Sequence, residues 1–390
     1  MMLGVSAEQD ELRASVRRFL ADRAPLTRVR ELMETDDGMD LAVWEQAGAQ
    51  LGLHGLAIPS SYGGGGFSFA EQAIVLEELG AALYGGPYLA SAVLAATALL
   101  ASPDEAARRD LLPGIASGQT IATLAFTEDD GSWDPGTIRL AAVKDGGDWR
   151  LDGHKSFVLD GGTAGLILVA AATDAGLSLF AVKGDGPGGT GGGSPPCAEE
   201  VGGGPAGLAR AVLPTLDQTR KLARLEFAGV TGALIGSPGD AVAVLDRTLD
   251  VAAIALAAEQ LGGAQRALDM AVAYAKMRHQ FGRPIGSFQT IKHRCADLLL
   301  EVESLRSAVG YAAAAVAEDS PEIPVLAPLV QAYASDTYFH VAAENIQIHG
   351  GIGFTWEHDA HLYFKRAKSS ELFLGDGSYH RERLAARIGL

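Results

Sequence analysis

The order in which residue periodicity changes along the chain limits its fold more than any other feature. Helical patterns fill residues 1 to about 118, short apolar runs separated by turns occupy 119 to about 230, and helical patterns then return until residue 390. A block of strands between two blocks of helices is typical of an α+β architecture. We therefore expect an N-terminal all-helical domain at 1–118, a middle β domain at 119–230 and a C-terminal helical bundle at 231–390.

Helix signals support the two outer blocks. Ser6 and Gln9 have the spacing of a capping box ahead of an apolar stripe that begins at Leu12. Long alanine-rich faces in the C-terminal block predict closely packed helices, which can continue between subunits. The helical patterns cover 41–51, 69–79, 88–100, 104–115, 241–278, 287–317, 321–349 and 360–372.

The middle block has the alternation and turn residues of strands. Asp145-Gly-Gly-Asp148 separates two apolar runs and predicts a hairpin. Ten glycines and three prolines at 184–204 predict a mobile loop. The G-x-G-x-x-G spacing inside that loop is not followed by a helix, so we read it as chance. The predicted strands cover 121–127, 138–143, 149–151, 156–159, 166–172 and 177–182.

Charge and composition exclude several classes of protein. The net charge is −17, from 31 basic and 48 acidic residues, which argues against nucleic-acid binding as the main role. Two cysteines, Cys197 and Cys295, support neither a disulfide framework nor a metal site. The uncharged stretch 79–103 is broken by Gly85-Gly86-Pro87, and the piece after this break is shorter than the roughly 20 residues of a membrane span. We expect a cytoplasmic protein without a metal site.

Two segments of the C-terminal block carry candidate binding residues. In the first, which contains Phe281, the side chains of Arg278, Arg283 and Gln289 surround a turn between helices, where a guanidinium and helix N–H groups suit a pyrophosphate. A turn with solvated arginines explains the same residues equally well. In the second, Gln347 precedes Gly350 and Gly351 at a helix end, where a ligand can approach the backbone closely.

Together these segments resemble the acyl-CoA dehydrogenase family, whose R-x-x-F-G turn, following Gln and Q-x-x-G-G-x-G segment hold FAD across a subunit interface. The resemblance spans nearly the whole chain and matches the α–β–α block order. It also includes Pro59-Ser-Ser-Tyr-Gly-Gly64, Phe126-Thr127-Glu128 and Gly153-His-Lys-Ser-Phe157. Actinobacterial-type members, including some that act on fatty or steroid acyl-CoA thioesters, are the most similar.

The resemblance implies a particular fold, reaction and set of partners. The fold would be helical domain, β-barrel-like middle domain and C-terminal four-helix bundle. The reaction would be FAD-dependent α,β-dehydrogenation of an acyl-CoA thioester, in which a carboxylate removes the α-proton and the β-hydride moves to flavin N5. The family also implies a homo- or hetero-tetramer (or dimer) and an electron-transfer flavoprotein as acceptor.

The position of the catalytic base departs from the family pattern. The family's Glu lies in a Y-E-G-T segment, and Asp376 takes its place if two residues are inserted upstream; without the insertion, Leu374 stands there. Asp376 is also a candidate helix N-cap. Some relatives carry the base on the long helix, where this chain has Ala252. Asp250 and Glu259 lie elsewhere on that helix.

The flavin contacts of the middle domain also differ. The resemblance places Thr127 and Ser132 near the isoalloxazine, with Ser132 shifted by one residue, and Phe157 at the family's stacking Trp. Leu159 stands where the family has a Thr. These departures leave three hypotheses: an active dehydrogenase with Asp376 as base, a non-catalytic subunit that completes the FAD site of a hetero-oligomer, and a related flavoenzyme that uses oxygen.

Overall fold

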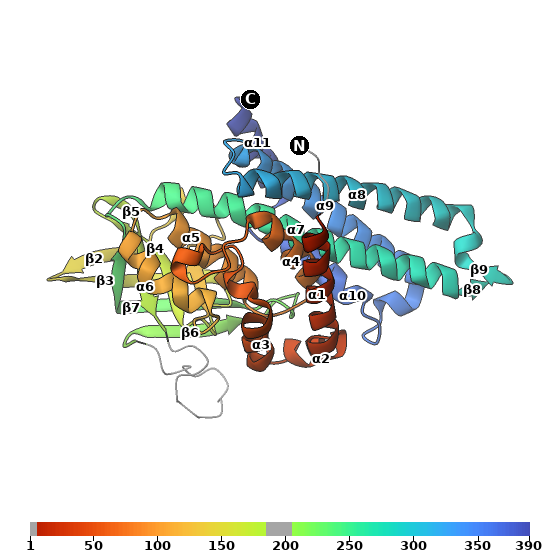
Figure 1. Cartoon of the computed structure of the whole chain (residues 1–390), viewed down its shortest axis with the longest axis horizontal. Coiled ribbons are helices and arrows are strands. Elements are labelled where there is room, and N and C mark those ends of the chain that lie inside the picture. The colour runs from red at the N-terminus through yellow and green to blue at the C-terminus, as the bar shows by residue number, and fades with distance from the viewer. Residues whose placement is uncertain (1–5, 185–204) are drawn as a thin grey trace. The chain divides into compact units, whose positions relative to one another are not determined.

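The computed structural model describes residues 6–184 and 205–390 (Figure 1). Its chain divides into two compact units. The first combines the described part of 1–30 with 68–84 and 253–390, and the second combines 31–67 with the described part of 85–252. The predicted glycine-rich loop, apart from Gly184, lies outside the described residues, as does Cys197.

The helices of the second unit follow the predicted patterns closely. The segment predicted as one helix at 88–100 begins as a buried π-helix and continues as an α-helix. Ser91 in this π-helix accepts a hydrogen bond from the backbone N–H of Ala122, at the start of the first strand. The bounds are α3 (Leu41–Leu51), the π-helix η3 (Leu89–Ala95), α5 (Ala96–Ala101) and α6 (Glu105–Ala116).

The strands of the second unit close into a barrel. Strand β4 pairs with β2 and with β5, and the path β2–β3–β7–β5 joins those two neighbours. Strand β1 extends this ring beside β4, and β6 pairs with β7. The bounds are β1 (Ala122–Ala125), β2 (Ala141–Asp145), β3 (Asp148–Leu159), β4 (Leu166–Thr173), β5 (Gly176–Lys183), β6 (Leu208–Leu213) and β7 (Leu222–Ile235). The β-barrel-like middle of the chain is thus confirmed.

Two details of the sheet differ from the predicted strands. The segments 149–151 and 156–159 are one strand, because the polar residues between them also pair with β7. Strands β6 and β7 were not among the predicted strands. The buried side chains of β7 alternate with exposed ones, and they enter the same core as Leu151 and Phe180.

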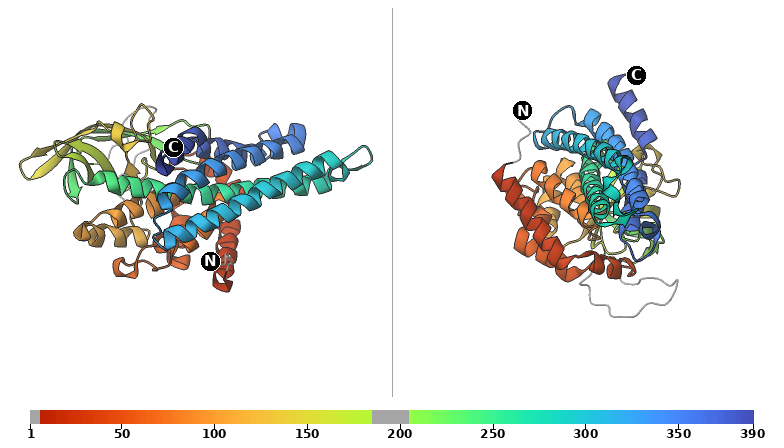
Figure 2. Two further views of the ribbon diagram at one scale, coloured as in Figure 1. Left: turned by 90° about the horizontal axis from the view of Figure 1, so that it is seen from above. Right: turned by 90° about the vertical axis from the view of Figure 1, so that its right-hand side faces the viewer.

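The first unit consists of helices. Helix α9 packs against α8, α10 and α11, and α1 packs against α4. The predicted capping box is present, since Ser6 and Gln9 exchange hydrogen bonds at the start of α1. Figure 2 shows α7 and α8 running side by side in opposite directions. The bounds are α1 (Ala7–Arg23), α4 (Phe69–Ala81), α8 (Gln289–Ala317), α9 (Ile323–His349), α10 (Ala360–Leu372) and α11 (Gly377–Ile388). Two further helices, α2 (Leu26–Met33) and α7 (Ala241–Met277), have residues in both units.

Glycines allow α4 and α7 to approach at backbone distance. A Cβ atom on Gly80 would lie 1.9 Å from the carbonyl oxygen of Glu259, and one on Gly262 would lie 1.8 Å from that of Glu77. Both contacts fall within the first unit. Among the described helices, none combines the length and apolar character needed to cross a membrane.

Two buried histidines make the stability of the fold depend on pH. His54 stacks on Trp44 with ring centroids 3.6 Å apart, and burial lowers its pKa to about 4. Burial likewise lowers the pKa of His380 to about 4. Because each folded-state pKa lies below the unfolded value, their contribution to stability is complete above the ordinary histidine pKa. It is lost as the pH falls toward the folded-state value.

We expect each of these histidines to lower the free energy of unfolding by about 2 kcal/mol when the pH falls from about 7.5 to about 5. Urea unfolding at both pH values, followed by tryptophan fluorescence, measures the difference. His54→Gln retains a side-chain N–H for the carbonyl of Trp44, which His54 contacts at 2.8 Å, but does not titrate. The variant should show a smaller loss, and an equal loss in wild type and variant would contradict the assignment.

Candidate functional site

A strained hairpin follows the end of α7. The helix ends at Met277, one residue before the predicted end at 278, and His279–Gln280 (β8) pairs with Arg283–Pro284 (β9). Phe281 and Gly282 form the tip with φ angles of +54° and +79°. Two consecutive positive φ angles are typical of a type I′ hairpin turn, and they explain why the helix stops early. A bulky residue with positive φ is rare, and the Phe281 side chain is 91% exposed.

The start of α8 lies next to this hairpin. The N-cap residue Phe288 makes no side-chain hydrogen bond to the first turn, which begins at Gln289. The guanidinium carbon of Arg283 lies 4.1 Å from the centre of the Phe288 ring, and Phe281 meets that ring edge-on. Backbone N–H groups at a helix start carry partial positive charge and bind anions well. Arg278, whose side chain is exposed, adds a full positive charge to the same hairpin.

The second predicted segment lies at the end of α9. Gln347 is exposed in the last turn, and Gly350 follows the helix with a φ of +65°. No other part of the described chain would contact a Cβ added at Gly350 or Gly351. Packing within the chain therefore does not account for glycine at 351. In contrast, a Cβ on Gly353 would lie 2.8 Å from the Cβ of His349.

Packing brings the two C-terminal segments together. The rings of Tyr274 in α7 and His349 in α9 stack with centroids 4.3 Å apart. Ile348 of α9 also belongs to a small apolar core. Ile285, directly after the hairpin, and Ile291, at the start of α8, pack against this core. Arg278, Phe281, Gln289, Gln347, Gly350 and Gly351 thus lie at one end of the first unit.

Asp376 lies at the start of α11, in the first unit. It is the N-cap, and one carboxylate oxygen (Oδ1) accepts the backbone N–H of Tyr379 at 2.8 Å. The side chain is exposed. Leu374, two residues earlier, is buried and has a φ of +66°. Asp376 therefore is the helix N-cap that the sequence offered as the alternative to a catalytic base. Its second carboxylate oxygen takes no part in the cap.

Helix α7 has neither of the alternative residues, Ala252 or Glu259, in a position suited to a catalytic base. Ala252 is fully buried. The carboxylate of Glu259 contacts the guanidinium of Arg366 at 2.6 Å, and both side chains are buried. This ion pair compensates two charges that would be costly to bury alone. The pair holds Glu259 in a structural role between α7 and α10.

Thr127, Ser132 and Phe157 belong to the second unit. Thr127 is buried and donates its hydroxyl hydrogen to the carbonyl of Ser156. The hydroxyl of Ser132 accepts the N–H of Asp134 at 3.2 Å. Phe157 has a φ of +57° at a break in the β3–β7 register, and its side chain is half-buried. Leu159 is buried.

Sequence reasoning quoted Lys155 and Glu128 within motifs but gave neither a role in the site. The structure places their side chains in contact, with Lys155 fully buried. One sequence signal was available: on a strand, successive side chains point to opposite faces, so Lys155 points to the face opposite His154 and Ser156. Among the described residues, no group of three or more His, Cys, Asp or Glu side chains is placed to hold a metal ion.

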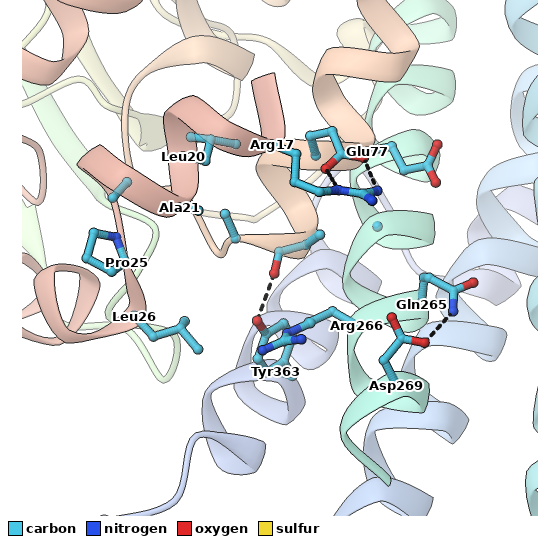
Figure 3. Close-up of a pocket in the computed structure, with 15 residues that line it drawn as sticks. Arg17, Leu20, Ala21, Pro25, Leu26, Glu77, Gln265, Arg266, Asp269 and Tyr363 are labelled. Carbon is cyan, nitrogen blue, oxygen red and sulfur yellow. Dashed lines mark hydrogen bonds and ion pairs between the residues drawn. The ribbon is translucent and has the colours of Figure 1, made fainter. Parts of the chain in front are cut away.

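A separate cavity of about 400 Å³ lies in the first unit between α1, α4, α7 and α10 (Figure 3). Arg17 pairs with Glu78 at 2.8 Å in its wall, and Tyr363 donates to the carbonyl of Ala81. Gln265 donates to Asp269. These polar groups bind one another, and none of the predicted site residues lines the cavity.

Comparisons with known proteins identify the family. Models described as the N-terminal, middle and C-terminal domains of acyl-CoA dehydrogenase match residues 6–119, 123–197 and 241–389. Acyl-CoA dehydrogenase IpdE2 of Mycolicibacterium smegmatis is 35% identical over 98% of this chain and 100% of its own length. The protein of the same name in Mycobacterium tuberculosis is 37% identical over 98% of this chain and 97% of its own length.

Solved structures agree with this assignment. A chain of the ChsE4-ChsE5 complex of Mycobacterium tuberculosis has a TM-score of 0.85 at 30% identity, covering 100% of this chain and 99% of its own. A chain of a Tcur3481-Tcur3483 steroid ACAD variant has a TM-score of 0.84 at 31% identity, covering 99% of each. This chain therefore belongs to the acyl-CoA dehydrogenase family, oxidoreductases that act on acyl-CoA and use a flavin.

Proposed function

We propose that this chain carries out the FAD-dependent α,β-dehydrogenation of an acyl-CoA thioester. The observation that carries the proposal is the hairpin between Arg278 and the start of α8, where Phe281 has a positive φ of +54° and a side chain that is 91% exposed. Backbone strain at an exposed aromatic residue persists where it serves a binding site. Membership of a flavin-using family supplies the class of ligand.

The chemistry of the residues fits FAD. Arg278, Gln289 and the N–H groups at the start of α8 would bind the pyrophosphate, because they combine positive charge with directed donors. Phe281, Gln347, Gly350 and Gly351 would bind the rest of the nucleotide. Thr127, Ser132 and Phe157 would contact the isoalloxazine ring. The bound flavin would accept the β-hydride of the acyl chain at N5.

Asp376 would remove the α-proton of the acyl chain. One of its oxygens accepts the N–H of Tyr379, so the second oxygen is the one that would take the proton. Aspartate is one methylene shorter than the family's Glu, and proton transfer is sensitive to displacements of about 1 Å. The substrate must therefore approach the start of α11 closely for Asp376 to act.

A second candidate function is supported by the cap geometry of Asp376 and by the burial of Leu374 and Leu159. In this alternative the chain completes the FAD site of a partner subunit that carries the base. The similarity to chains of ChsE4-ChsE5 and Tcur3481-Tcur3483 supports it, since each of these is named for two proteins. The two candidates differ in whether this chain alone turns over a substrate.

Several finer assignments belong to the same proposal. We place the domain boundaries at 1–118, 119–230 and 231–390, and we propose a cytoplasmic homo- or hetero-tetramer, or a dimer. The acceptor of the electrons would be an electron-transfer flavoprotein. The substrate would be a fatty or steroid acyl-CoA thioester.

Product analysis tests the proposal. The purified chain is incubated with straight-chain, branched and steroid acyl-CoA thioesters and an artificial electron acceptor, and products are identified by mass spectrometry. We expect one class of thioester to yield an enoyl-CoA lighter by two hydrogens. If product forms only after co-expression with a paralogue that carries the usual Glu, the second candidate is correct; no product in either case would contradict both.

A further inference from the structure

Strand β3 departs from regular geometry where it approaches the loop after β1. Its pairing register with β7 shifts between Lys155 and Val158, which leaves Ser156 and Phe157 in an irregular segment. Phe157 adopts a φ of +57°, which a large side chain rarely tolerates. A β-bulge of this kind re-aims a side chain and needs support from its surroundings. The loop after β1 provides that support.

A buried ion pair connects the loop to the strand. Lys155 is fully buried, and its ammonium donates to Glu128 Oε1 at 2.8 Å and to the carbonyl of Phe126 at 3.1 Å. The carboxylate of Glu128 also accepts the backbone N–H groups of Arg139 and Leu140, at 3.0 and 2.8 Å. One carboxylate thus binds the far end of the loop and the neighbouring strand together. We call Lys155 and Glu128 the clasp.

The opposite face of β3 binds the same loop. His154 and Ser156 point away from Lys155, and both contact the carboxylate of Asp129. At the backbone, the N–H of Ser156 donates to the carbonyl of Thr127 at 3.0 Å. Residues of the loop are therefore held on both faces of the strand, and the clasp also binds the backbone of residues 139 and 140.

Burying the charged groups of the clasp costs free energy, so we expect the clasp to have a function besides stabilising the fold. Burial lowers the pKa of Lys155 to about 8, against the opposing effect of Glu128. A buried ion pair is often no more stabilising than apolar residues of similar volume. We expect such a pair where it favours one conformation of the chain over others. Here that conformation is the one that places Thr127, Ser132 and Phe157.

We propose that Lys155 and Glu128 are positioning residues, which fix the loop at 127–140 against the β3 bulge and thereby hold Thr127, Ser132 and Phe157 in place for the flavin. The inference rests on the proposed function for its second half, the effect on the flavin. The first half, the conformation of the loop, is a property of the chain itself.

Hydrogen exchange tests the first half. Lys155→Met retains most of the apolar volume but removes the charge, so amides at 127–140 should exchange about tenfold faster, with little change at 166–183. Lys144→Met, which removes an exposed lysine from the neighbouring strand β2, is the matched control and should change neither region. Unchanged exchange at 127–140, or an equal increase throughout the sheet, would overturn the clasp.

Flavin binding tests the second half. Lys155→Met should raise the dissociation constant for FAD about tenfold and shift the visible absorption band of the bound flavin, because the groups around the ring lose their fixed arrangement. Glu128→Gln should do the same, and the double variant should be little worse than either single one, since coupled residues are not additive. Unaltered binding and spectrum in Lys155→Met would overturn the positioning role.

The two measurements separate the inference from the proposed function. A wild-type chain that binds no FAD, alone or with a partner subunit, would contradict the proposed function. Exchange at 127–140 would still decide whether the clasp holds the loop, because that measurement needs no flavin.

Discussion

Arg278→Ala is expected to lose FAD during purification. Arg278 lies at the base of the hairpin that precedes α8, where its guanidinium would make charge-assisted hydrogen bonds to the pyrophosphate. One such contact is worth about 1.5–3 kcal/mol, so the dissociation constant for FAD should rise roughly 10- to 150-fold. Fluorescence titration of the flavin-free variant with FAD measures the change.

The matched control for this variant is Lys276→Ala, which removes an exposed positive charge from the last turn of α7. It lies two residues before Arg278 and should leave FAD binding within about twofold, as expected for a screened surface charge. Equal FAD affinity in wild type and Arg278→Ala would remove Arg278 from the site. Equal losses in both variants would indicate a general effect of charge and no specific contact.

Asp376→Asn is expected to reduce turnover by about 10²- to 10⁴-fold, the usual contribution of a general base. Asparagine is as good an N-cap as aspartate, so the start of α11 should remain intact while the proton acceptor is lost. Stability and FAD content should therefore match those of the wild type. Steady-state kinetics with the thioester identified by product analysis gives the turnover.

The matched control is Asp297→Asn, which makes the same substitution at an exposed acid of the same unit, on α8. Its turnover should stay close to that of the wild type. If Asp376→Asn, alone or in a complex with a partner, turns over substrate as fast as the wild type, Asp376 is not the base. That outcome would favour the subunit that completes a partner's FAD site.

Local periodicity accounts for much of the fold. The predicted bounds of α3 and α10 match the structure, because amphipathic patterning and helix-ending residues agree there. The hairpin after α7 was not foreseen, because the positive φ of Phe281 is set by the tertiary structure and leaves no local pattern. The π-helix at Leu89–Ala95 was also not foreseen, because all seven of its residues are buried and show no distinct period.

The candidate site, like the fold, could be predicted from the sequence only in part. Arg278, Phe281, Gln289 and Gln347 could be recognised because each stands in a short motif with a clear spacing. The strain at Phe281 and Phe157 could not, because backbone angles depend on what packs around the residue. Lys155 was overlooked because lysines are rarely fully buried, and only the three-dimensional contact with Glu128 shows its role.

The most direct test of the account is the visible absorption spectrum of the purified chain, recorded anaerobically before and after addition of a panel of acyl-CoA thioesters. We expect a bound flavin that is bleached by one class of thioester, because binding and reduction both occur on this chain. A colourless protein, or a bound flavin that no thioester bleaches, would contradict a self-sufficient dehydrogenase and would direct the search to a partner subunit by co-purification.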